Sequence, residues 1–146
     1  MMISTIYEER KGDYLISTDR SLLDLDVIHR YLSQESYWAK GIARDQVARM
    51  IEHSSLVFGL YYQNRQIGFA RVMTDTVRFA YLADVFVLPE FQGKGLGKWL
   101  VEFIVSLPEV QVKKFLLATR DAHSLYAKYG FEPLNQPEKF MRKLGK

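Results

Sequence analysis

The stretch that most constrains this chain runs from residue 82 to residue 107 and joins an apolar strand to a helix through a glycine-rich turn. Residues 85–88 are apolar over the length of a strand, and Pro89 should end it because proline has no N–H to give to a sheet. The turn QGKGLG, residues 92–97, precedes apolar residues at helical spacing. The first N–H groups of a helix lack partners within the helix, and glycines let a ligand approach the backbone. The stretch therefore predicts an anion-binding cradle.

Length and composition limit the alternatives. A chain of 146 residues predicts one domain, spanning residues 1–146. The net charge of +3 is mild and not gathered in one block, which speaks against nucleic-acid binding. The sequence has no cysteine and only three scattered histidines, so we expect no disulfide, no cysteine nucleophile and no metal site. Because no run approaches about 18 apolar residues and the N-terminus lacks the core of a signal peptide, we expect a cytoplasmic protein that does not enter membranes.

Apolar spacing and turn residues divide the chain into short strands and helices. Alternation and β-branched runs mark strands, and apolar residues three or four apart mark helices. The expected elements are a strand at 14–18, a helix through 25–32 capped by Asp19 or Ser21, an aromatic loop at 36–41, a helix at 43–52, strands at 55–63 and 66–74, a long strand at 77–88, the helix after the glycine turn, a strand at 115–118, a helix at 122–129, and one or two strands within 131–142. Asn64-Arg65 is the expected hairpin turn, and Gly130 the expected helix C-cap.

These elements predict an α+β fold. The strands before the glycine turn should be antiparallel because tight turns join them, whereas a strand–helix–strand unit should make strands 79–88 and 115–118 parallel. A bulge or bend is expected inside the long strand, because strands of this length usually break or twist. The sequence therefore predicts a central mixed, mostly antiparallel sheet with about four helices that cover both faces.

The glycine turn departs from the two commonest nucleotide-binding motifs. A Walker phosphate loop needs Ser or Thr directly after Gly-Lys, and here Trp99 follows Lys98. A dinucleotide fingerprint needs a third glycine three positions after Gly95, and that position is Lys98; the turn also lies outside an N-terminal βαβ unit. A tight turn without any ligand is a further alternative, but three glycines at a helix start would then lower stability, and no ligand binding would compensate for that cost.

Two motifs resemble one known family. The spacing Gln-x-x-Gly-x-Gly of Gln92, Gly95 and Gly97, after an apolar strand that ends in proline, resembles the acyl-CoA loop of the GCN5-related N-acetyltransferase (GNAT) family. The segment LYAKYGF, residues 125–131, resembles the helix of that family that ends in Leu-Tyr-x-x-x-Gly-Phe. The family's element order covers residues 14–142. The resemblance implies a single N-acetyltransferase domain with a GNAT-like fold, splayed between strands 79–88 and 115–118.

The resemblance implies acetyl-CoA as co-substrate and no metal. The amides of the turn and the helix dipole can hold the pyrophosphate of coenzyme A, and Lys94 and Lys98 either add positive charge there or are solvated surface lysines. The pantetheine arm would run along the strand before the turn. Thr119 stands where many members of the family carry Asn, so its contact with the cofactor is the weaker part of the resemblance. The residues expected to bind the cofactor are Phe86, Val87, Gln92, Gly93, Lys94, Gly95, Leu96, Gly97, Lys98, Thr119 and Ala122.

Acetyl transfer from a thioester to an amine needs an acid for the departing sulfur and a base for the amine. The resemblance implies Tyr126 as the general acid; the alternatives are that it is a buried aromatic, or that Tyr129 substitutes for it. Asp84 is the expected base, acting directly or through a water, and it is otherwise an anchor for a cationic acceptor or a bulge residue. His123 is the other titratable candidate, one helical turn before Tyr126.

The family's acceptor cleft is built from the first two helices and their connecting loop. Tyr37 and Trp38 in that loop either wall a pocket or fix the loop to the sheet, and Arg71 either meets an acceptor carboxylate or faces solvent. We expect an N-acetyltransferase that acts on a small primary amine by direct attack in a ternary complex, as a monomer or homodimer. The alternatives are transfer to a protein or peptide amine, and a catalytically silent acyl-CoA-binding sensor.

Overall fold

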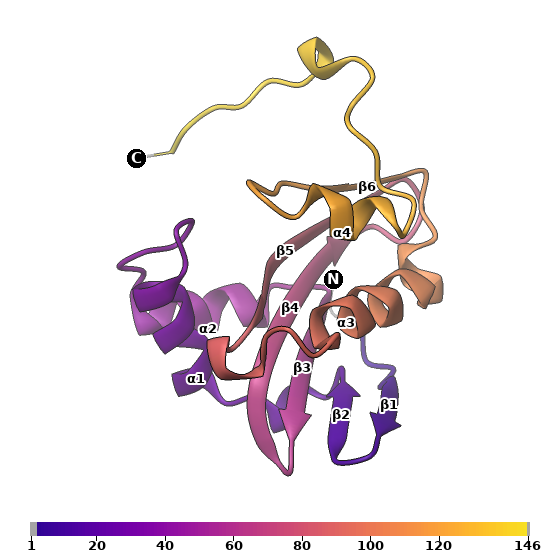
Figure 1. Ribbon diagram of the computed structural model, residues 1–146. Helices are drawn as coiled ribbons and strands as arrows, with labels where there is room; N and C mark the ends of the chain where they lie inside the picture. The colour runs from indigo at the N-terminus through magenta and orange to yellow at the C-terminus, as the bar shows by residue number, and fades with distance from the viewer. Residues whose placement is uncertain (1–2, 146) are drawn as a thin grey trace.

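The computed structural model describes residues 3–145, in which one sheet of six strands organises the chain (Figure 1). The strands follow one another across the sheet in sequence order, and every neighbouring pair is antiparallel except the parallel pair β5–β6. The strands are β1 (Glu8–Lys11), β2 (Tyr14–Ser17), β3 (Leu56–Tyr62), β4 (Arg65–Thr74), β5 (Phe79–Val87) and β6 (Lys114–Leu117), and the α-helices of the described part are α1 (Leu25–Arg30), α2 (Arg44–Glu52), α3 (Leu96–Ser106) and α4 (His123–Ala127).

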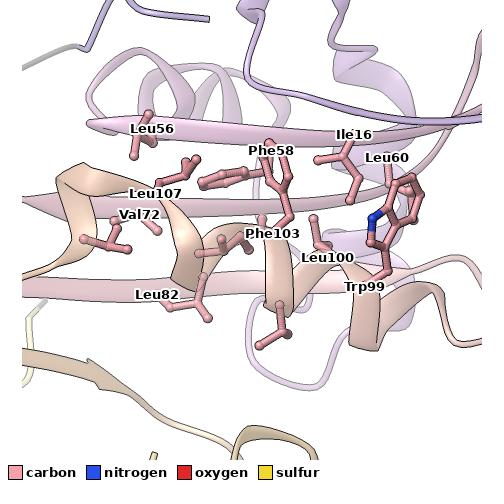
Figure 2. Packing of buried hydrophobic residues seen from close by; sticks show 14 of the residues in the cluster. Ile16, Leu56, Phe58, Leu60, Val72, Leu82, Trp99, Leu100, Phe103 and Leu107 are labelled. Carbon is pink, nitrogen blue, oxygen red and sulfur yellow. The ribbon is translucent and has the colours of Figure 1, made fainter. Parts of the chain in front are cut away.

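The larger part of the core lies between the sheet and α3. Because side chains of a strand alternate between faces, Phe58 of β3 points toward α3 while its neighbour Val57 points to the other face. Figure 2 shows Trp99, Leu100 and Phe103 of α3 packed against β3. The rings of Phe58 and Phe103 pack in a T-shaped arrangement, with ring centroids 6.2 Å apart. Burial of this apolar face of α3 holds the glycine turn at the end of β5.

A second apolar cluster lies between the opposite face of the sheet and the first two helices. Ile28 of α1 and Val47 of α2 are fully buried there against Phe69 and Phe86. The ring of Phe86 also stacks on Tyr31, with centroids 4.0 Å apart. Helices therefore cover both faces of the sheet, as the sequence predicts. Among the described residues, no helix combines the length and the apolar character that crossing a bilayer requires.

The predicted α+β fold is confirmed, and so are the two special features of the long strand. A register shift in the β4–β5 pair lies between the pairs Phe69–Phe86 and Arg71–Ala83, so β5 carries one extra residue there. Asp84, within this bulge, has a φ of 56°, a left-handed conformation that aspartate tolerates better than most residues. The pairing of β5 with β6 ends at Leu82 and Leu117, while β5 continues to Val87. The two strands are therefore splayed, as expected.

Three predictions in the first half of the chain were wrong in detail. β1, which precedes the first predicted strand, was missed because all four of its residues are polar and exposed. The helix α1 begins at Leu25 and is capped by Asp24, whose carboxylate accepts the N–H groups of residues 26 and 27; Asp19 caps a separate 3₁₀ turn instead. α1 ends at Arg30 and continues as a π-helical turn, Tyr31–Glu35.

Three further predictions were wrong around the turns and at the C-terminal end. The hairpin turn is Gln63-Asn64 rather than Asn64-Arg65, and both turn residues have positive φ, which matches the twist of the strands. α4 is a short helix that ends at Ala127, before the predicted residue 129. Within the described residues after 130, no strand forms, and the only regular element is a 3₁₀ turn at Pro137–Lys139.

We expect Leu100→Ala to lower the free energy of unfolding by about 2–5 kcal/mol, because Leu100 lies on the fully buried face of α3 and the loss of its side chain leaves a cavity. Chemical denaturation monitored by circular dichroism measures the change. Val77→Ala is the control, since Val77 is 68% exposed and its truncation should change the free energy by less than about 0.5 kcal/mol. Equal effects of the two substitutions would contradict the packing described here.

Candidate active site

The glycine turn presents an open row of backbone donors. Gly93 and Gly95 have φ values of 81° and 79°, and Gly95 is the N-cap of α3. Within the described part of the chain, the amides of residues 93–98 donate to no protein atom. A Cβ atom at Gly93 or Gly95 would meet no atom within 4 Å, so these positions border open space rather than packed protein. The turn therefore offers free N–H groups at a positive helix end, with the exposed Lys94 and Lys98 beside them.

Not every side chain of the turn points toward the cradle. Gln92 donates from its Nε2 to the carbonyl of Val87, 2.9 Å away, which ties the turn to the end of β5. Leu96 is buried in the core under α3, so only its amide is available to a ligand. Gly97 is a helical residue whose added Cβ would lie 3.9 Å from Val87, an ordinary contact distance. The predicted roles of Leu96 and Gly97 as ligand contacts thus rest on their backbone amides, whereas the backbone N–H of Gln92 already donates to Pro89 O, 3.2 Å away.

The end of β5 exposes alternate backbone groups to the gap left by β6. The backbone N–H of Leu88 donates to the carbonyl of Ile67 in β4. Because backbone groups alternate in direction along a strand, those of Phe86, two residues earlier, also bond to β4. The N–H of Val87 consequently points away from β4 and toward the gap, whereas its C=O accepts from Gln92 Nε2. Val85, at the edge of the bulge, lines the cleft. Val85 is a residue that the sequence analysis missed, although the two-residue period of a strand, counted back from Pro89, indicates it.

Tyr126 lies on α4, across the gap from β5, and lines the cleft between them. Its side chain is 8% exposed, and its ring meets Phe131 edge-on with centroids 5.8 Å apart. Burial, with a smaller contribution from the nearby Tyr37, raises the pKa of Tyr126 to about 12. The phenol therefore keeps its proton throughout the neutral range. Tyr129, the other tyrosine of the motif, is absent from this cleft and faces Glu102.

Asp84 is held by two donors from distant parts of the chain. Its Oδ2 accepts from Arg71 Nε at 2.6 Å, and its Oδ1 accepts from the indole Nε1 of Trp38 at 2.6 Å. The side chain of Asp84 is 6% exposed and that of Arg71 is 18% exposed, so the ion pair is largely buried. A carboxylate has about four acceptor positions, and these bonds use two of them. The remaining positions are available to a water or an amine in the cleft that Asp84 lines.

The aromatic loop reaches across the cleft. Tyr37 accepts a hydrogen bond at its hydroxyl from the backbone N–H of Arg120, 3.1 Å away, and the Arg120 guanidinium lies 3.9 Å from the centre of the Tyr37 ring. Buried Ser36 fixes the base of the loop by donating to Leu32 O and accepting from Ala39 N. Tyr37 and Trp38 are 48% and 43% exposed and both line the cleft, and the indole of Trp38 also ties the loop to β5 through Asp84. Arg120 is a second residue that the sequence analysis missed.

The cleft enclosed by these elements has a volume of about 690 Å³, in the range typical of small-molecule sites. It brings Asp84 and Tyr126 together with five further residues that the sequence analysis predicted for the site. Thr119 accepts from Ala122 N at 3.0 Å and so orders the start of α4. His123 is exposed and does not line the cleft. The lining residues that belong to the predicted set are Tyr37, Trp38, Arg71, Asp84, Thr119, Ala122 and Tyr126.

Metal ligands do not gather in this region. Across residues 3–145, no three side chains of His, Cys, Asp or Glu are arranged to hold a metal ion.

Comparisons with known proteins find acetyltransferases. The family model of the GNAT acetyltransferase domain matches residues 53–133. A Gibberella zeae protein designated an acetyltransferase is 33% identical over 81% of this chain and 78% of its own length. The ycf52 N-acetyltransferase of Porphyra purpurea, itself uncharacterized, is 37% identical over 84% of this chain and 72% of its own. A Xanthomonas campestris crystal structure assigned to the GNAT family has a TM-score of 0.86 and 48% identity, covering 90% of this chain and 93% of that chain.

We expect Arg71→Met to lower the free energy of unfolding by about 3 kcal/mol, because it leaves the carboxylate of Asp84 largely buried without its cation. The double variant Arg71→Met/Asp84→Asn should recover part of this loss, since the uncompensated charge is then gone. Urea denaturation at pH 7 measures both.

Arg44→Met is the control for this cycle. It breaks an ion pair with Asp26 whose side chains are 57% and 69% exposed, and it should cost less than about 1 kcal/mol. A loss for Arg71→Met no larger than that for Arg44→Met would show that the pair at Asp84 is solvated.

Proposed function

Because the chain belongs to the GNAT acetyltransferase family, we propose that it transfers the acetyl group of acetyl-CoA to the primary amine of a small molecule. The observation that carries this proposal is the gap between β5 and β6 beyond Leu82 and Leu117. The glycine turn lies at one end of β5, and Asp84 and Tyr126 line the cleft beside the gap. A cofactor that bonds to the free edge of β5 thus has its phosphates beside a helix start and its acyl end in the cleft.

The free backbone groups support the fit of coenzyme A. The unpartnered amides of residues 93–98 suit the pyrophosphate, and Lys94 and Lys98 add positive charge beside it. The free N–H of Val87 and the backbone of Val85 in the cleft lining suit the amides of the pantetheine arm, which bonds there as an additional strand would. Gln92 keeps the turn against β5 through its bond to Val87 O. Thr119 and Ala122 line the far side of the gap.

When bound, acetyl-CoA supplies the acetyl group as a thioester, and the amine nitrogen attacks it only in its unprotonated form. Tyr126 donates its phenolic proton to the departing sulfur, a role for which it must be protonated before the reaction. Its raised pKa keeps it so at neutral pH. Because the sequence given has no cysteine to carry an acyl group, direct attack by the amine in a ternary complex is the favoured route.

Asp84 accepts the proton that the amine gives up, directly or through one water. The bonds from Arg71 and Trp38 fix the carboxylate at the bulge and leave acceptor positions for the cleft. The carboxylate in the cleft lining also attracts the acceptor as an ammonium ion before the amine gives up its proton. His123 is a weaker candidate because its exposed side chain lies outside the cleft.

A small acceptor is favoured by the loop contacts around the cleft. Tyr37 and Arg120 touch each other and so join the two loops that flank the site, which bounds the space in which an acceptor sits. The aromatic faces of Tyr37 and Trp38 offer apolar contact to its carbon skeleton. Arg71 has Nη2 left after its bonds to Asp84, Ser54 and Met73, and this atom can meet an acceptor carboxylate.

We expect acetyl-CoA at 100 times its dissociation constant to stabilise the protein by about 2.7 kcal/mol and to raise its melting temperature. Gly95→Glu should abolish that rise, because it places bulk and negative charge in the cradle. Thermal unfolding with and without acetyl-CoA measures the shift. Gly12→Glu is the matched control: Gly12 also has a positive φ, 59°, but lies in the β1–β2 turn. It should strain the fold and leave the ligand-induced rise intact; loss of the rise in both variants would refute the cradle.

We expect Tyr126→Phe to lower kcat by about 10²–10⁴-fold while acetyl-CoA still raises the melting temperature. For the wild type, kcat/KM should rise with pH as the amine loses its proton, and no falling limb should occur below pH 10, because the pKa of Tyr126 is about 12. An amine library, monitored by release of the free thiol of CoA, identifies the acceptor and gives these profiles. Acetyl-CoA binding without turnover on any amine would instead indicate a sensor.

A further inference from the structure

A second groove adjoins the acceptor cleft beside helix α2. It has a volume of about 530 Å³, and it shares Ile42, Met50 and Arg71 with the lining of the cleft. Because the two spaces have these walls in common, a molecule bound beside Asp84 in the cleft can extend into the groove. None of the reaction steps proposed above involves the groove.

One side of α2 forms a wall of this groove. The residues that the helix and its C-cap supply to the lining are Gln46, Arg49, Met50 and His53. Positions three and four apart lie on the same side of a helix, so these side chains leave α2 in one direction. Val47 holds the helix in place, because it is fully buried in the apolar cluster on the sheet face opposite α3 (Figure 1). The wall is therefore a fixed part of the fold.

The groove carries positive charge. Arg49 is exposed and, within residues 3–145, forms no ion pair. Arg71 is tied to Asp84 through Nε and keeps Nη2 for a ligand. His53 adds a ring nitrogen that can donate a hydrogen bond. No Asp or Glu side chain of the described residues lines the groove. This charge favours an anionic ligand.

The C-terminal end of α2 also lies at this groove, and the last carbonyls of a helix carry partial negative charge that would repel an anion. Arg20 offsets that charge, because its guanidinium donates to the carbonyls of Ile51 and Ser54. The same bonds attach the end of the helix to the 3₁₀ turn at Arg20–Leu22. Arg20 thereby weakens the unfavourable contribution of the helix and fixes the wall of the groove.

Apolar side chains separate the cations of the groove from the carboxylate of the cleft. Ile42, Met50 and Met73 are partly buried and line the groove. Asp84 lines the cleft but not the groove, whereas Arg49 lines the groove but not the cleft. An elongated ligand thus meets a carboxylate at one end, carbon surface in the middle and a cation at the other end.

We propose that the acceptor is a primary amine with an anionic group, a carboxylate or a phosphate, at the other end of its carbon skeleton, and that Arg49 and Arg71 bind this group in the groove. The inference rests on the proposed function, since it specifies the acceptor of the same reaction. The ammonium end is attracted to Asp84 before it loses its proton, and the two charges of the acceptor keep it in one orientation. Arg49 touches no reacting atom, so its role is to determine specificity.

Isothermal titration calorimetry tests the groove without requiring turnover. The probes are ω-aminoalkanoates and ω-aminoalkyl phosphates of increasing chain length, each compared with the alkylamine of the same length, with CoA at saturating concentration. An anionic probe of either kind should bind about tenfold more tightly than its alkylamine, which is the effect of one hydrogen bond to a charged group. Arg49→Gln should remove this preference and leave the binding of the alkylamine unchanged.

Arg44→Gln is the matched control. Arg44 is also an exposed arginine of α2, but it pairs with Asp26 and does not line the groove. This variant should keep the preference for the anionic probes. The absence of a preference in the wild type, or an equal loss in the two variants, would overturn the anionic subsite.

Steady-state kinetics with acetyl-CoA separates a wrong acceptor class from a wrong reaction. Arg49→Gln should raise KM for the anionic amine about tenfold and leave kcat nearly unchanged, because the lost contact is the same in the ground state and in the transition state. Turnover of neutral amines with the same kcat/KM as anionic ones would refute the subsite and leave acetyl transfer intact. Binding of anionic amines that depends on Arg49, without turnover of any amine, would instead refute the proposed reaction and support the subsite.

Discussion

The structure depends on one interruption of hydrogen bonding, where β6 stops pairing with β5 at Leu117 while β5 runs on to Val87. Backbone groups inside a protein are nearly always paired, so a strand left half-bonded beside a cleft favours the proposed binding of another molecule there. The bulge at Asp84 lies just beyond the last β5–β6 pair and adds twist to β5 there. The packing of α3 against β3 then fixes the glycine turn at the end of the same strand. One continuous edge thus joins the glycine turn to the cleft that Asp84 and Tyr126 line.

Asp84 shows how the fold combines a strained backbone with a fixed side chain. Its left-handed conformation turns the carboxylate into the cleft, and its partners Arg71 and Trp38 come from β4 and from the loop between α1 and α2. Trp38 connects this central strand to the wall of the acceptor cleft, while Tyr37 connects that wall to the loop before α4. The site is assembled from four segments, so its geometry depends on the whole sheet rather than on any one motif.

Local patterns predicted the parts of this arrangement that are local. The glycine turn, the bulge in β5 and the parallel pair followed from residues close together in the sequence, and the two motifs indicated the family. The strand β1 could not be found in this way, because its residues EERK have neither alternation nor apolar character and form a strand only by pairing with β2. The bond from Trp38 to Asp84 and that from Arg120 to Tyr37 span 46 and 83 positions, and no spacing rule reports such contacts. Residues 131–142 were predicted to contain one or two strands, but within the described residues this segment pairs with no strand of the sheet, and a strand needs such a neighbour.

The cradle at Gly93 and Gly95 offers a ligand main-chain atoms, whereas the cleft at the other end of β5 offers side chains. A substitution among the side chains beside the cradle leaves the amides in place, provided that the two glycines keep their positive φ values. A substitution at residue 37, 38 or 71 changes the shape and charge that an acceptor meets. The donor half of such a protein is thus robust to mutation and the acceptor half is adaptable. A lineage built on this scaffold can acquire new acceptors while its dependence on one activated acyl carrier stays unchanged.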